Sequence, residues 1–149
     1  MKILVTIGTT DFEDLIVFCD QMAKDSEHFF TLQIANLDYE PKFSNYFRFN
    51  EKIEKLFGES DLIICHAGAG TVYGLLEIGK PIVVVPNSKL KDNHQVDICK
   101  FIENEGYGLV AWSLDKLSQN IELAVKMKFK VYSNNGSNLI KEISQILRN

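Results

Sequence analysis

Short apolar runs that alternate with helix-like segments are the feature of this sequence that most restricts its fold. Residues 62–65 and 81–85 are apolar and bounded by turn-forming residues, which is typical of strands buried on both faces. Segments with apolar residues at helical spacing, such as 15–24 and 93–105, separate these runs. The alternation predicts an α/β fold with one doubly wound, parallel sheet.

The predicted elements follow one another without a linker, a repeat or a low-complexity segment, so we expect a single domain, 1–149. The predicted strands are residues 2–7, 29–35, 46–49, 62–65, 81–85 and 108–112. The predicted helices are residues 15–24, 51–58, 71–78, 93–105, 114–128 and 138–148. Ligands of such sheets bind beyond the carboxyl ends of the strands. The loops expected there are residues 8–14, 50–51, 66–70 and 87–95.

Composition excludes several classes of function. Twenty Asp and Glu against sixteen Lys and Arg give a formal net charge of −4. Such a domain lacks the basic surface that binds nucleic-acid phosphates, so we expect no nucleic acid partner. Three cysteines without CxxC spacing indicate reduced core thiols rather than a disulfide framework or a zinc site. The apolar runs are far shorter than the ~20 residues that span a bilayer, and no signal peptide is visible, so we expect a cytoplasmic protein.

The segment HAGAGT, which begins at His66, is the most informative for chemistry because it joins a buried strand to a helix. Its small residues Gly68, Ala69 and Gly70 let a ligand approach the backbone, and the N–H groups of a helix start suit phosphate. Thr71 is expected at the cap or first position of the helix, and His66 either bonds a phosphate or ties the loop. The alternative is a tight turn whose glycines serve only packing.

Other ligand chemistries find little support. The spacing of Gly68, Gly70 and Gly74 is one residue out of register with the GxGxxG fingerprint, which argues against a nicotinamide cofactor. No serine lies in a GxSxG setting, and the histidines and cysteines lack the spacing of zinc ligands. We therefore expect no catalytic nucleophile, no metal and no cofactor.

The loop after the first strand is a second candidate site. Gly8 ends the strand, and Thr9 and Thr10 offer hydroxyl groups near a predicted helix start. Helix capping that begins at Asp11 explains the same residues, so the two interpretations stay open. Phe12 either packs under this turn or meets a partner.

His94 and Gln95 lie in the first turn of a further predicted helix, on the same side of the sheet. The amide of Gln95 can donate to and accept from a pair of sugar hydroxyls. His94 can do the same or exchange a proton. A solvated helix start is the alternative.

Four segments, in this order, resemble the Alg13 family: VTIGTTDFEDLI, HAGAGT, EIGKPIVVVPNSKLKDNHQ and EGYG. This family comprises the donor-binding subunits of the N-acetylglucosaminyltransferase that builds the lipid-linked oligosaccharide. The resemblance covers residues 2–112. More distantly, the chain is similar to the C-terminal half of MurG-type GT-B glycosyltransferases. It is also similar to the short PssE- and EpsF-type bacterial polysaccharide subunits that work in pairs.

The resemblance implies a Rossmann-like half of a GT-B enzyme of glycosyltransferase family 28. Such a chain is the donor-binding, catalytic subunit of a heteromeric hexosyltransferase, which transfers GlcNAc or a related hexose from UDP to a lipid-linked acceptor. A membrane-anchored, Alg14-like subunit is expected to bind the acceptor and to recruit this cytoplasmic chain to the membrane. Helix dipoles and amides would take the place of a metal in stabilising the departing UDP.

The resemblance also implies the donor site. Its expected residues are Gly8, Thr9 and Thr10 near the diphosphate; Phe49, Asn50 and Ile53 around the uracil; His66, Gly68, Ala69, Gly70 and Thr71 at the phosphates; Glu77; and His94 and Gln95 at the donor sugar. Gly74 stands where the family has a ribose-binding Glu, and Glu77 reaches the ribose only if the helix start is shifted. The departure leaves an alternative open, a non-catalytic enhancer or stabilising subunit of a polysaccharide glycosyltransferase pair.

The last predicted helix, 138–148, carries an apolar stripe at helical spacing. The stripe consists of Leu139, Ile140, Ile143, Ile146 and Leu147. It docks either onto this domain's own sheet or, as the resemblance implies, onto the membrane-anchored partner.

Overall fold

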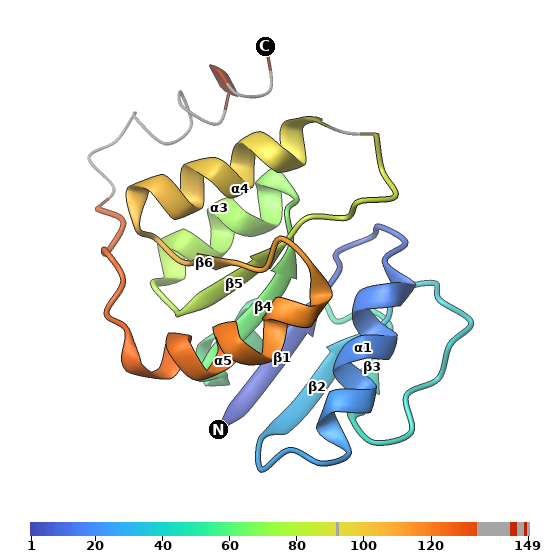
Figure 1. Ribbon diagram of the computed structural model, residues 1–149. Helices are drawn as coiled ribbons and strands as arrows, with labels where there is room; N and C mark the ends of the chain where they lie inside the picture. The colour runs from blue at the N-terminus through green and yellow to red at the C-terminus, as the bar shows by residue number, and fades with distance from the viewer. Residues whose placement is uncertain (92, 134–143, 146–147, 149) are drawn as a thin grey trace.

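The computed structural model describes residues 1–91, 93–133, 144, 145 and 148, and within them the strands form one parallel sheet (Figure 1). The six strands are β1 (Lys2–Thr6), β2 (Phe29–Gln33), β3 (Asn45–Phe47), β4 (Leu62–His66), β5 (Ile82–Val85) and β6 (Leu109–Val110). The helices are α1 (Glu13–Ala23), α2 (Ile53–Glu59), α3 (Ala69–Ile78), α4 (Asn93–Glu105), a 3₁₀ turn η1 (Leu114–Lys116) and α5 (Leu117–Lys126). The spatial order β3-β2-β1-β4-β5-β6 confirms the predicted doubly wound sheet.

Every predicted strand and the first five predicted helices are present, with some ends displaced. The helix predicted from residue 71 begins at Ala69, because Gly68 has an extended backbone (φ −81°, ψ 128°) and stands immediately before it. Thr71 is therefore the third residue of α3, and its expected cap or first position is wrong. The predicted helix 138–148 and its apolar stripe lie largely outside the described residues.

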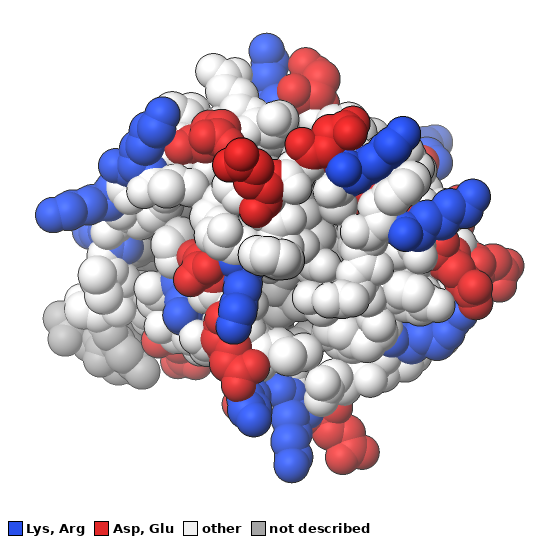
Figure 2. All heavy atoms as spheres, turned by 90° about the horizontal axis from the view of Figure 1, so that it is seen from below, with Lys and Arg blue, Asp and Glu red and all other residues white. Residues whose placement is uncertain are grey.

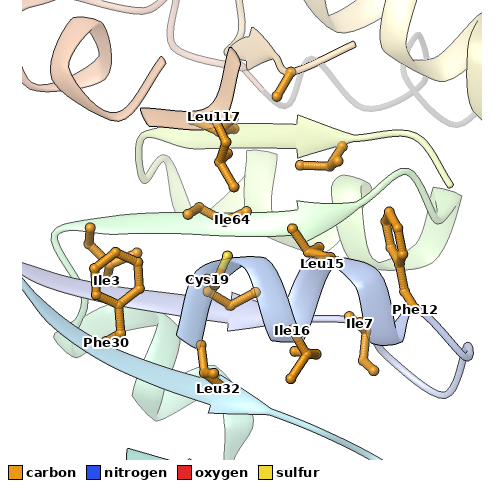
Figure 3. Packing of buried hydrophobic residues seen from close by; sticks show 14 of the residues in the cluster. Ile3, Ile7, Phe12, Leu15, Ile16, Cys19, Phe30, Leu32, Ile64 and Leu117 are labelled. Carbon is orange, nitrogen blue, oxygen red and sulfur yellow. The ribbon is translucent and has the colours of Figure 1, made fainter. Parts of the chain in front are cut away.

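Two layers of helices cover the sheet. Alternate side chains of the central strands point to α1 and α5 on one face and to α2, α3 and α4 on the other. Figure 3 shows the first of these cores, in which Leu15 and Cys19 of α1 lie against Ile64 of β4. Phe12 belongs to this core, so it packs under its turn as one of the two interpretations predicted. All three cysteines are buried and unpaired, as expected of core thiols.

The strand order reverses between β1 and β4, and this reversal creates the ligand crevice. After β1 the chain turns to α1 on one face, whereas after β4 it turns to α3 on the other. The two loops therefore separate at the carboxyl ends of adjacent strands, the usual binding position in such sheets.

A buried carboxylate holds the long connection between β2 and β3. Asp20 of α1 accepts hydrogen bonds from the Tyr39 hydroxyl (2.6 Å) and from the backbone N–H groups of Lys42 (2.8 Å) and Phe43 (2.9 Å). Burial pushes the pKa of Asp20 up, but these hydrogen bonds outweigh it and hold the pKa below its ordinary value. The carboxylate thereby fixes the segment that leads into β3 and, beyond it, one side of the crevice.

The surface carries no single large area of one charge on the side seen in Figure 2. Lys and Arg side chains alternate there with Asp and Glu side chains. Among the described residues, no helix has the length and apolar character needed to cross a membrane.

Candidate functional site

A cavity of about 730 Å³ opens at the carboxyl ends of β1 and β2, between α2 and α3. Its floor consists of Thr6, Gly8, Thr9 and Gln33. Its α2 wall consists of Phe49, Asn50, Glu51, Ile53, Glu54 and Phe57. Its α3 wall consists of Gly70, Thr71, Gly74, Glu77 and Ile78. A volume of this size is within the range of sites for small molecules and cofactors.

The cavity brings together residues predicted from three separate loops. Those that line it are Gly8, Thr9, Phe49, Asn50, Ile53, Gly70, Thr71 and Glu77. Those outside its lining are Thr10, His66, Gly68, Ala69, His94 and Gln95. Thr10 and Ala69 adjoin lining residues, and Gly68 lies two positions before Gly70. Contact of these three residues with a ligand stays a prediction.

Sequence reasoning missed the polar floor. The Thr6 hydroxyl donates to Oε1 of Gln33, and Nε2 of Gln33 donates to the backbone oxygen of Gly8 (3.3 Å). Both side chains are buried, so each must be hydrogen-bonded to be tolerated there. A polar residue at the carboxyl end of each of two neighbouring strands was the available signal.

The α3 wall presents bare backbone to the cavity. A Cβ atom added at Gly70 or Gly74 would meet no heavy atom within 4 Å, so the space beside both residues is open. The first N–H groups of a helix lack intrahelical acceptors, and the helix dipole adds a partial positive charge at this end. A ten-residue helix that begins at Ala69 thus directs donors toward the region beside Gly70 and Thr71.

His66 lies beneath this helix start, between the backbones of two glycines. A Cβ atom at Gly68 would overlap Nε2 of the His66 ring, and one at Gly8 would approach its Cε1 to 2.9 Å. Gly8 also has a positive φ of 60°, which favours glycine. The ring therefore leaves no room for a side chain at either glycine. It packs against both the β1–α1 loop and the loop before α3.

The imidazole of His66 is an unusual group to bury. Only 7% of the residue is exposed, and Nδ1 has no hydrogen-bond partner in the described part of the chain. Burial lowers the pKa of His66, and this outweighs the opposite effect of the Thr6 backbone, so the neutral form is favoured. Leaving a buried polar atom unpaired costs about 1–3 kcal/mol, but His66 lies outside the cavity lining, so its ring supports the two glycine loops from below.

The α4 side of the site differs from the expectation. Gln95 is buried, and its Oε1 accepts a hydrogen bond from the backbone N–H of Asn87 (2.9 Å). A solvated helix start is therefore wrong for Gln95, since the protein itself uses one end of the carboxamide. His94, beside it, is half-buried. The role of both residues in reading a sugar stays a prediction.

Capping explains part of the β1–α1 loop. Oδ1 of Asp11 accepts from the N–H of Glu13 at 3.4 Å, while Phe12 occupies the cap position without a side-chain hydrogen bond. Thr9 is exposed and lines the cavity floor, so capping does not account for it.

Glu77 lies on the α3 wall although Gly74 leaves a gap one turn before it. Its Oε1 accepts a hydrogen bond from the Tyr73 hydroxyl (2.7 Å). With Glu51 and Glu54 on the α2 wall, three carboxylates line the cavity, and none of the lining residues is Lys or Arg. No group of three or more potential metal ligands occurs in the described residues.

Known proteins are similar to this chain in sequence. Human "UDP-N-acetylglucosamine transferase subunit ALG13" is 36% identical over 118 residues, which are 70% of this chain and 10% of that protein. The protein of the same name from Cryptococcus neoformans is 37% identical over 82 residues, 54% of this chain and 40% of that protein. This chain thus spans well under two thirds of the length of these relatives.

Solved structures share the fold at lower identity. MurG of Acinetobacter baumannii superposes on all of this chain and 52% of its own length, with a TM-score of 0.73 and 22% identity. The solution structure of ALG13 matches 97% of this chain and 94% of its own, with a TM-score of 0.63 and 18% identity. At these identities the likeness concerns the Rossmann-like half of a GT-B fold alone.

The sequence of this chain also matches the model of a protein family. The model of the glycosyltransferase family 28 C-terminal domain matches residues 2–148, almost the whole chain. The resemblance derived from the loop motifs is thereby confirmed. Because this match covers nearly the whole chain, the chain belongs to the glycosyltransferase family 28 C-terminal domain family.

Proposed function

We propose that this chain is the donor-binding, catalytic subunit of a UDP-sugar glycosyltransferase, with the donor in the cavity between α2 and α3. The observation that carries the proposal is the cavity of about 730 Å³ at the strand ends, which the start of α3 borders at Gly70 and Thr71. The N-terminus of a helix suits a diphosphate, because its backbone N–H groups and its dipole favour negative charge.

The diphosphate would lie against the start of α3. Gly70 leaves room for its oxygens beside the backbone, and the hydroxyls of Thr71 and Thr9 lie on the cavity lining. Since no Lys or Arg lines the cavity, the protein's contribution there is dipoles and N–H groups rather than full positive charges.

The nucleoside would lie toward the α2 wall. Phe49 is 54% exposed, and Ile53 is half-buried, so both offer apolar surface to a base. Across the cavity, the Tyr73 hydroxyl holds one oxygen of Glu77, which leaves the other oxygen able to accept from a ribose hydroxyl. An acid on the α3 wall thus remains despite Gly74.

In the proposed reaction an acceptor hydroxyl attacks the anomeric carbon of the donor sugar. The new glycosidic C–O bond forms as the bond to the diphosphate breaks, UDP departs with the electron pair, and a base takes the hydroxyl proton. Dipoles of α3 stabilise the charge that develops on UDP. A second, membrane-anchored Alg14-like subunit would supply the lipid-linked acceptor site and the base.

UDP-GlcNAc is the proposed donor because relatives at 36–37% identity carry UDP-N-acetylglucosamine transferase in their names. The second candidate is a non-catalytic helper that stabilises a transferase partner. Gly74, which offers no side chain to a ribose, and the three carboxylates around the cavity favour that alternative.

Calorimetric titration of the full chain with UDP, UDP-GlcNAc, UDP-glucose and UDP-galactose tests the proposal. We expect UDP and UDP-GlcNAc to bind, and the absence of binding at millimolar concentration, alone and with the co-purifying partner, would refute the donor site. Gly70→Glu would place a carboxylate at the helix start without a clash and should remove binding. Gly58→Glu is its control, since Gly58 on α2 also has open space but does not line the cavity.

The same variants separate the two candidates. If Gly70→Glu abolishes turnover by the reconstituted pair while Gly58→Glu leaves it intact, this chain is the donor subunit. If the pair transfers sugar equally well with either variant, the helper role holds and the catalytic proposal fails.

A further inference from the structure

One buried carboxamide joins three segments around the site. Asn87, in the loop between β5 and α4, is 5% exposed. Its Nδ2 donates to the backbone oxygen of Asp11 (3.0 Å), and its backbone N–H donates to Oε1 of Gln95 (2.9 Å). Its Oδ1 accepts from the N–H of Lys89 (3.2 Å), which shapes its own loop. Through its side chain and its backbone together, Asn87 thus ties the β1–α1 loop to α4.

The β1–α1 loop has a second anchor on its opposite side. Nε2 of Gln33 at the end of β2 donates to the backbone oxygen of Gly8 (3.3 Å). Two buried carboxamides, one at the end of β2 and one in the loop after β5, therefore hold two carbonyl groups of the same loop. Thr9 and Thr10 lie between these fixed points.

We propose that Asn87 is a positioning residue, which with Gln33 keeps the carbonyls of the β1–α1 loop turned inward so that the loop can receive a diphosphate. The inference rests on the proposed donor site. A carbonyl oxygen that faces a phosphate repels it, whereas a loop whose Gly8 and Asp11 carbonyls are already bonded presents its hydroxyl groups without reorganisation. Neither Asn87 nor Asp11 lines the cavity, so Asn87 acts through the loop.

An exposed ion pair between the loop after β5 and the first turn of α1 provides a matched control. Nζ of Lys89 lies 2.8 Å from Oδ2 of Asp14, and the two side chains are 71% and 50% exposed. Solvent-exposed pairs of this kind contribute little to stability. Removing it leaves the buried connection through Asn87 in place.

The experiment measures the affinities of UDP and UMP for the full chain with Asn87→Ala, Asn87→Asp and Lys89→Ala. Asn87→Asp keeps an acceptor for Lys89 N–H but loses the donor to Asp11. We expect both Asn87 variants to bind UDP about tenfold more weakly, as for loss of one hydrogen-bonded group, and UMP nearly as the wild type does. Lys89→Ala should bind both ligands like the wild type. Hydrogen exchange of residues 9–11 should become faster only in the Asn87 variants.

If Asn87 has only a structural role, its variants should have a lower melting temperature but an unchanged ratio of UDP to UMP affinity in the folded protein. That result would overturn the proposal. Gln33→Met, which loses the donor to Gly8 and adds no charge to the cavity floor, should reproduce the lowered ratio and serves if the Asn87 variants do not fold. If the wild type binds no UDP, the donor site fails as well. If the wild type binds UDP and all these variants match it, only the positioning role fails.

Discussion

The two walls of the cavity offer different things to a ligand. On the α3 wall, Gly70 and Gly74 expose backbone, with open space where side chains would stand. On the α2 wall, Phe49, Ile53 and Glu54 expose side chains. The backbone wall is suited to oxygens of any phosphate, whereas the side-chain wall can distinguish one base from another.

The walls also differ in how firmly they are held. The helix start on the α3 side rests on the buried ring of His66, and both adjoining glycines have no room for a Cβ. The α2 wall consists of a seven-residue helix with one buried residue, Phe57, and exposed side chains before it. Changes near the α3 wall should therefore affect fold and binding together, and changes on the α2 wall should affect binding alone.

The largest effect is expected from Gly68→Ala. Its methyl group would overlap the His66 ring, so we expect a loss of about 1–3 kcal/mol in the free energy of unfolding and loss of UDP binding. Gly70→Ala, two residues on, has open space and should fold at least as well, since alanine favours a helix by ~1 kcal/mol over glycine. Denaturant unfolding measures both variants. Equal stability of Gly68→Ala and the wild type would mean that the ring does not hold this wall.

A smaller effect, confined to binding, is expected from Phe49→Ala. Stacking of a base on an aromatic ring contributes about 1–3 kcal/mol, so UDP affinity should fall about tenfold. Because Phe49 is 54% exposed, the free energy of unfolding should change by no more than ~0.5 kcal/mol. Phe29→Ala, at a residue 74% exposed and outside this cavity, is the control. An unchanged UDP affinity of Phe49→Ala would remove the base from the α2 wall.

The smallest effect is a pH dependence that belongs to the α3 side. Burial holds the pKa of His66 below its ordinary value, so the unfolded chain binds this proton more readily than the folded chain does. The free energy of unfolding should therefore fall as the pH drops below the ordinary histidine pKa of ~6.5 and through the lowered one. Melting temperatures measured across this range should decline less for His66→Gln than for the wild type. Parallel curves would show that His66 does not titrate in this way.

The sequence was sufficient for the strands and for the edge of the sheet at which the cavity opens. Strands buried on both faces must be apolar over their whole length, so residues 62–65 and 81–85 marked the centre of the sheet without knowledge of the fold. The order of the elements then placed the glycine loop and the β1–α1 loop at the same edge. For this reason Gly8, Gly70 and Thr71 were predicted together.

The remaining site residues depend on contacts that no local pattern records. Gln33 meets Gly8 across 25 positions, and Asn87 meets Asp11 across 76. The start of α3 at Ala69 depends on the backbone of Gly68, which the His66 ring constrains. Glu54 enters the cavity because α2 crosses beside α3, a matter of packing rather than of spacing.

The absence of Lys and Arg from the cavity lining has a consequence for how a ligand is found and kept. Without a cationic funnel, and with three carboxylates on the lining, the site gains no long-range attraction for anions, and encounter with an anionic ligand should become faster as ionic strength rises. Inorganic phosphate and nucleoside triphosphates, which cytosols contain in excess, would be drawn no faster than any other solute. The selectivity of such a site then depends on short-range fit, and it can remain open among abundant competing polyanions.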